Sequence, residues 1–195
     1  MLSLPAPRLT VLVDRNEKRP LPFPALMPWT FGTGRHKVER TFHLDIDNTQ
    51  YLPAGDYMLK GYEHICRVER KGAISELMQN LFTRDRARQE RSLKKLIDSC
   101  RVPYLLLDMH PRECMVDPYV KNPAEVMAEV YRLCAWRGLR LLWLSVGNDV
   151  NARRNVGLQV ANILWAHAWE YLVKEQTKKR SPTVVVGETN GSRKN

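Results

Sequence analysis

The chain has 195 residues, enough to bury the core of one ordinary domain and too few for two full domains. Its formal net charge of +10 favours a polyanionic partner, first of all nucleic acid, although charge does not separate DNA from RNA or an anionic membrane surface. No secretion signal, membrane span or zinc-type cysteine spacing is evident, so we expect a soluble cytoplasmic protein.

The first predicted strand covers residues 9–14, LTVLVD, an apolar β-branched run that ends on Asp14. Asp14 and the nearby Glu17 are, taken alone, typical of an exposed turn after a strand. Residues 19–37 carry four prolines, so we expect a long ordered loop without regular structure. Arg35 and Lys37 place positive charge in this loop and are candidate nucleic-acid contacts.

Residues 41–46 alternate like a half-buried strand and lead into residues 51–71, which read as two strands joined by a turn. The first of these strands carries Asp56, and the second carries Glu69 and Lys71. Residues two apart leave the same face of a strand, so Glu69 and Lys71 can meet at one point. Two carboxylates beside an ammonium suit Mg²⁺ and phosphodiester cleavage, whereas the same residues also fit an ordinary charged edge strand.

A predicted helix over residues 73–82 follows, and a strongly basic segment comes after it. Such a segment is typical of a solvated helix face, but beside a phosphodiester-cutting centre it would also follow a nucleic-acid backbone. The candidate DNA-binding residues in it are Arg84, Arg86, Arg88, Arg91 and Lys94.

The remaining predicted elements are a strand at 103–108, a loop at 109–121, a helix from Asn122, a strand at 139–146 and a helix at 149–174. The last helix has an apolar stripe wider than one sheet face requires. This width fits a homodimer and a core-only packing equally well. From residue 175 to 195 the apolar periodicity stops, and we expect a basic disordered tail.

The hairpin resembles the signature of the ERCC4 (XPF/Mus81-type) nuclease domain, in which an Asp is followed by Glu-x-Lys. The matching residues are Gly55, Asp56 and Tyr57, then Val68 to Lys71. The resemblance implies an α/β fold with a restriction-endonuclease-like core, in which helices flank a mixed central β-sheet on both faces. It covers about residues 8–170 of a predicted nuclease domain at 1–174, and the chain is similar to the compact stand-alone members of the family found in bacteriophage genomes.

The resemblance also implies a Mg²⁺-dependent DNA endonuclease, with Mn²⁺ as a substitute, that prefers branched or flap-containing DNA. Asp56 and Glu69 would bind metal with help from Asp14 or Glu17. Lys71 would position or activate water, Arg70 would brace the loop, and Arg88 would hold the phosphate.

Two departures from the family pattern, Asn16 for Arg and Ser75 for Asp, leave open a catalytically impaired DNA-binding scaffold that acts with a partner. Glu76 beside Ser75 is expected to point about 100° away around its helix, so either Glu76 substitutes for the missing acid or that acid is dispensable. A basic RNA-binding domain is supported by charge alone.

Overall fold

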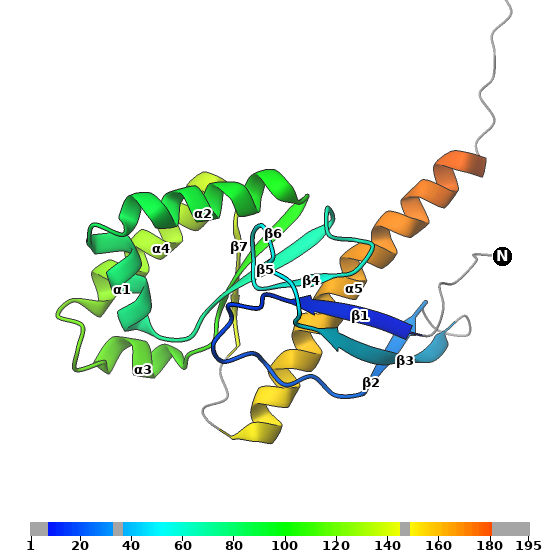
Figure 1. Cartoon of the computed structure of the whole chain (residues 1–195), viewed down its shortest axis with the longest axis horizontal. Helices are drawn as coiled ribbons and strands as arrows, with labels where there is room; N and C mark the ends of the chain where they lie inside the picture. The colour runs from blue at the N-terminus through cyan, green and yellow to red at the C-terminus, as the bar shows by residue number, and fades with distance from the viewer. Residues whose placement is uncertain (1–7, 33–36, 145–148, 181–195) are drawn as a thin grey trace, which may run out of the picture.

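Seven strands form one mixed sheet in the spatial order β2-β3-β1-β4-β5-β6-β7 (Figure 1). The computed structural model describes residues 8–32, 37–144 and 149–180. Strands β1 and β3 are parallel, as are β5, β6 and β7, whereas β4 is antiparallel to both of its neighbours. The strands are β1 Arg8–Val13, β2 Leu26–Phe31, β3 Val38–Asp47, β4 Tyr57–Leu59, β5 Cys66–Lys71, β6 Val102–Leu107 and β7 Arg140–Trp143.

Alternate residues of β6 separate the two hydrophobic cores of the protein. Leu105 and Leu107 pack with the helices α1 (Ile74–Phe82), α2 (Arg86–Ser99) and α4 (Pro123–Arg137). Leu106 points to the other face and packs with α5 (Val150–Arg180). A short helix, α3 (Pro111–Val116), lies against α4. The expected mixed sheet with helices on both faces is therefore confirmed.

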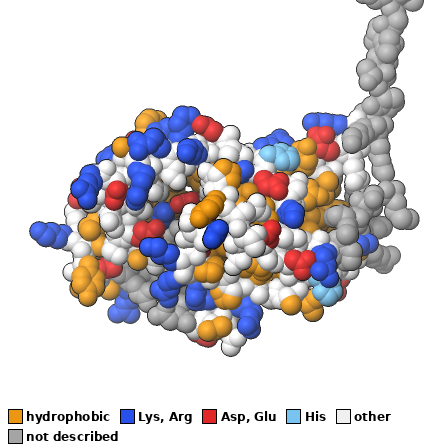
Figure 2. Space-filling model, viewed as in Figure 1, with side chains coloured by type: hydrophobic (Ala, Val, Ile, Leu, Met, Phe, Trp, Pro, Cys, Tyr) orange, Lys and Arg blue, Asp and Glu red, His pale blue; other side chains and the backbone are white. Residues whose placement is uncertain are grey.

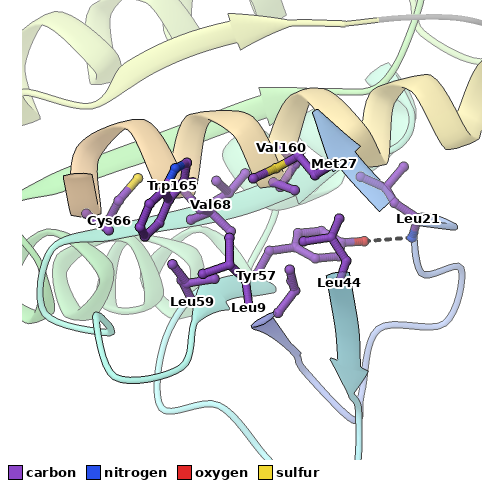
Figure 3. Close-up of a cluster of buried hydrophobic side chains, with 14 of the residues drawn as sticks. Leu9, Leu21, Met27, Leu44, Tyr57, Leu59, Cys66, Val68, Val160 and Trp165 are labelled. Atoms are coloured by element: carbon purple, nitrogen blue, oxygen red, sulfur yellow. Dashed lines mark hydrogen bonds between the residues drawn. The ribbon is translucent and has the colours of Figure 1, made fainter. Parts of the chain in front are cut away.

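The α5 face of the sheet is built around buried aromatic side chains (Figure 3). Trp165 is fully buried, and its ring centroid lies 4.9 Å from that of Phe42 on β3. The Tyr57 hydroxyl accepts a hydrogen bond of 3.0 Å from the Leu21 N–H, which ties the segment before β2 to the centre of the sheet. Because Tyr57 is fully buried, this bond satisfies a polar atom that is shielded from solvent.

The structure corrects three sequence-based boundaries. The expected loop at 19–37 contains the edge strand β2, whose Trp29 lies opposite Arg40 of β3. The expected loop at 109–121 contains α3. Helix α5 continues to Arg180, so the first residues of the predicted tail are helical, and residues 181–195 lie outside the described part.

The wide apolar stripe of α5 is largely occupied within the chain. Val160, Leu164 and Trp165 are buried in the core, while Trp169 packs against Phe31 with ring centroids 5.2 Å apart. Strand β2, which the sequence did not reveal, supplies this extra contact surface. The homodimer through α5 stays a prediction.

In the described part of the chain, no helix combines the length and apolar character needed to cross a lipid bilayer.

Candidate active site

The candidate site lies where β5 ends, at what we call the Lys71 end of the sheet. Glu69 and Lys71 leave the same face of β5, as their spacing predicts, and the Lys71 Nζ lies 2.8 Å from Glu69 Oε1. Both residues are buried, with 9% and 6% of their surfaces exposed. Burial disfavours the ammonium, but the carboxylates of Glu69 and Glu76 outweigh it and raise the pKa of Lys71 above its usual value. Lys71 is therefore a cation at neutral pH.

Asp56 stands beside this pair, immediately before β4. Its backbone N–H donates to the Val68 carbonyl, and the register of Tyr57 opposite Val68 places Asp56 across from Glu69. The Asp56 carboxylate accepts one hydrogen bond, of 2.6 Å, from the Arg70 N–H. Burial raises the pKa of Asp56 well above its usual range, and the negative charge of Glu69 raises it further. The site thus gathers two carboxylates that repel each other and an ammonium.

The position of Asp56 depends on Gly55 and Arg67. Gly55 has φ of 77°, a left-handed conformation, and a Cβ there would lie 3.1 Å from a Leu96 side-chain carbon. Arg67 is buried and donates hydrogen bonds to the carbonyls of Ala54 and Glu63. Sequence reasoning missed Arg67, because a single Arg in a strand gives no sign that it will bind backbone carbonyls.

Glu76 reaches the site, contrary to the expectation that it points away. Its Oε1 lies 3.2 Å from Lys71 Nζ, and its Oε2 accepts a hydrogen bond from the Gly72 N–H. Glu76 occupies the third position after Ala73, the N-cap residue of α1, from which a Glu side chain folds back toward the chain before the helix. The position of Glu76, three residues after the N-cap residue of the helix, is the sequence signal that could have predicted this contact.

Arg70 leaves the opposite face of β5 and has its own carboxylate partners. Its guanidinium contacts Asp108 Oδ2 at 2.6 Å and 2.9 Å, and Glu17 Oε1 at 3.4 Å. The three side chains are nearly buried, so each charge depends on the others. Arg70 therefore links the ends of β5 and β6 to the segment after β1. It acts as a brace rather than as a group facing Glu69 and Lys71.

Of the four predicted metal ligands, Asp56 and Glu69 lie next to each other, whereas the carboxylates of Asp14 and Glu17 bind other groups. Glu17 binds Arg70, and the Asp14 carboxylate accepts a hydrogen bond of 2.6 Å from the Asn16 N–H. The Asp14 backbone N–H donates to the Asp56 carbonyl, so Asp14 still lies next to Asp56. Within the described ranges, no group of three or more His, Cys, Asp or Glu side chains could hold a metal ion.

The Asp56–Glu69 pair nevertheless fits a divalent cation of the Mg²⁺ class. Its donors are hard carboxylate oxygens, and Mg²⁺ is commonly held by one or two carboxylates together with water and substrate oxygens. Burial, and then the charge of Glu69, raise the pKa of Asp56. A bound cation would favour the charged form of this carboxylate.

The predicted DNA-binding residues of the basic segment are exposed on or just before α2, and Lys and Arg side chains gather around this helix at the upper left of Figure 2. Three of them form surface ion pairs, Arg86 with Glu90 and Glu129, Arg88 with Asp85 and Lys94 with Asp98. Lys37 is exposed and pairs with Glu39 at 2.6 Å, and Arg35 lies outside the described residues.

Comparisons with protein-family models and with curated proteins gave no match. Among solved structures, the chain is similar to XPF from Aeropyrum pernix, with a TM-score of 0.52 and 19% identity, over 79% of this chain and 60% of that one. A second match, "XPF from Aeropyrum pernix, complex with DNA", has a TM-score of 0.49 and 20% identity over 91% and 69% of the two chains. The chain thus spans about 60% of the length of the first of these structures. The protein therefore has an XPF-type fold, as the resemblance of its hairpin implied.

Proposed function

We propose that this protein is a Mg²⁺-dependent DNA endonuclease. The single observation that carries the proposal is the meeting of Asp56, Glu69 and Lys71 on one face of the sheet. Burying two acidic side chains and a cation in one place lowers the stability of the fold, because each charge loses its hydration. A cluster of this kind is therefore not explained by stability alone. Such clusters of perturbed charges are typical of functional sites.

Asp56 and Glu69 are the residues that would hold the metal ion. When bound, the ion supplies a more acidic water and positive charge beside the scissile phosphate. The hydrogen bond from the Arg70 N–H fixes the orientation of the Asp56 carboxylate before any ion arrives. Glu69 is fixed in the same way by Lys71.

Lys71 acts as a charged group and not as a base. Because Glu69 and Glu76 raise the pKa of its ammonium, it keeps its proton at neutral pH and can donate hydrogen bonds to a phosphate oxygen. Glu76 is 44% exposed at its side chain, so it is the member of the cluster that a substrate meets first. We infer that Glu76 moves toward water when a phosphate takes its place beside Lys71.

DNA is the proposed substrate because the chain has a net charge of +10 and exposes Arg84, Arg88 and Arg91 around α2. XPF from Aeropyrum pernix, whose fold this chain shares, has been solved in complex with DNA. Preference for flaps, forks or four-way junctions is the finer part of the proposal and follows the resemblance of the hairpin. Repair or recombination of DNA would be the setting for such an activity.

The test is cleavage of labelled linear duplex, flap, fork and four-way-junction DNA with Mg²⁺ or Mn²⁺, against EDTA. We expect cleavage only with metal, and at least a hundredfold lower rates, about 3 kcal/mol in activation free energy, for D56N and E69Q. The matched control is D45N, which removes a half-exposed carboxylate of β3 that pairs with Arg8 and should cut like the wild type.

Retained metal-dependent cutting by D56N or E69Q would remove the proposed mechanism. Binding of every substrate without any cleavage would instead support the catalytically impaired scaffold. DNA affinity should remain within about threefold of the wild type in both variants, since the basic residues around α2 are unchanged.

A further inference from the structure

A polar pocket of about 250 Å³ lies at the opposite end of the sheet from Lys71. Because β5, β6 and β7 are parallel, their first residues gather at this end, which we call the Arg101 end. Arg101 precedes β6, Arg140 begins β7, and Lys174 comes from the last turns of α5, which extend beyond the sheet (Figure 1). The side chains that give the pocket its polar lining are Arg101, Arg140, His167, Glu170, Tyr171 and Lys174.

The two arginines of the pocket are oriented by aromatic rings rather than by acids. The Arg101 guanidinium lies over the Tyr171 ring at 5.7 Å, and that of Arg140 lies over Tyr104 at 5.8 Å. In the described part of the chain, neither arginine has a carboxylate oxygen within the 4.0 Å of an ion pair. A guanidinium held by its flat face keeps its N–H groups available for a planar or tetrahedral anion.

The other polar groups of the pocket leave it a surplus of positive charge. Glu170 is its only acid among the lining residues, and Lys174 binds it at 2.6 Å. The His167 Nε2 lies 3.0 Å from the Tyr104 hydroxyl, so this ring is also fixed in place. Glu170 also interacts electrostatically with Arg140, but one carboxylate against Arg101, Arg140 and Lys174 leaves the lining with a net surplus of two positive charges.

We propose that this pocket binds the phosphate group of a nucleotide, either free or as one unit of a nucleic-acid strand. Two oriented guanidiniums match the oxygens of a phosphate, and Arg is the side chain best suited to such contacts. The cavity is larger than a phosphate alone and smaller than most pockets for drug-sized ligands, which suits one nucleotide. The site uses none of the residues at the Lys71 end, so it stands whether or not the protein cuts DNA.

The test follows the His167 ring signals by NMR while inorganic phosphate, deoxyadenosine monophosphate or a short oligothymidylate is added. Loss of the signals in H167Q identifies them. We expect saturable shifts in the wild type and an affinity at least tenfold lower in R101Q/R140Q. The matched control, R8Q/R154Q, removes two exposed arginines elsewhere and should bind like the wild type.

Lys174→Gln provides an independent variant on the exposed surface of α5, and it should also weaken binding. Saturation by the monophosphate but not by the oligonucleotide would assign the pocket to free nucleotides. Saturation by both, with the same loss in R101Q/R140Q, would assign it to a strand. Unchanged affinity in R101Q/R140Q, or no shift with any probe, would overturn the proposal.

Discussion

Asp56 and Glu69 lie next to each other although the charge of Glu69 disfavours the ionised form of Asp56. Burial and the neighbouring charge both raise the pKa of Asp56, and its one hydrogen bond from Arg70 does not offset them. The folded protein therefore binds a proton at Asp56 more tightly than the unfolded chain does. Stability from this group is fully present below the ordinary aspartate pKa of 3.8 and is lost as the pH rises through the folded value.

Asp56→Asn should consequently stabilise the metal-free protein while it removes activity. The Asn oxygen still accepts the hydrogen bond from Arg70, and the charge that burial penalises is gone. We expect the free energy of unfolding in EDTA to rise by about 1 kcal/mol or more at pH 7, the equivalent of one pKa unit. Urea denaturation at a series of pH values measures this difference, which should shrink toward zero near pH 4.

Added Mg²⁺ should make the wild type more stable than D56N, the reverse of the order expected in EDTA. An ion that binds only the folded state raises the Tm of the wild type as its concentration rises above its Kd, and it leaves D56N unchanged. A metal-free D56N that unfolds more easily than the wild type at pH 7 would contradict the proposed charge conflict. D45N again serves as the control and should show neither effect.

At the scale of elements, α5 closely approaches the segment between β1 and β2 at Gly157. A Cβ at this position would lie 2.2 Å from the Pro22 carbonyl oxygen, which belongs to the segment between β1 and β2. The same segment is tied to the sheet through the hydrogen bond between Leu21 and Tyr57. Gly157 therefore permits the close contact between α5 and the segment that leads into β2.

Gly157→Ala should destabilise the protein, although Gly to Ala inside a helix normally stabilises it by about 1 kcal/mol. Pro22 and α5 must separate to admit the methyl group, and overpacking of this kind costs about 1–3 kcal/mol. Thermal or urea unfolding measures the change. Asn155→Ala, on the exposed surface of the same helix, is the control and should be neutral or slightly stabilising; a stabilised G157A would disprove the close contact.

Over the whole molecule, the buried acids of the candidate site and the main groups of basic residues lie in different regions. The buried acids lie at the Lys71 end of the sheet, the exposed basic residues follow α2, and the phosphate pocket lies at the Arg101 end. Helix α2 runs toward the Arg101 end, because it ends at Ser99 and β6 begins directly after Arg101. A bound strand that follows α2 would pass from one site toward the other.

Neutralising part of α2 should therefore weaken DNA binding and also reduce its dependence on salt. For R84Q/R88Q/R91Q we expect the slope of log affinity against log salt to fall by about 2–3, since each lost phosphate contact accounts for about 0.9. Fluorescence anisotropy with duplex DNA in EDTA measures the slope without cleavage. The control variant R8Q/K60Q/R154Q loses the same charge at exposed positions away from α2 and should lower the salt slope less. Equal slopes for the two triple variants would contradict a DNA path along α2.

The sequence by itself determined those strands and helices that have a clear local periodicity, and the hairpin that carries the motif. The two-residue spacing of Glu69 and Lys71 is enough to place them on one face, because strand geometry repeats every second residue. The helix at 73–82 and the apolar strands could be predicted for the same reason. The resemblance of the hairpin then gave the fold class, since its residues occupy a fixed place in that sheet.

Only the tertiary structure decided which charges meet, because their partners are far apart in the chain. Arg70, at the end of β5, forms ion pairs with Asp108 after β6 and with Glu17 after β1. Glu76 binds Lys71 instead of pointing away from it. Strand β2 forms despite its proline because it lies at the edge of the sheet, where β3 and α5 cover it. The pocket at the Arg101 end is also a product of topology, since parallel strands bring Arg101, Arg140 and Lys174 together although no sequence motif joins them.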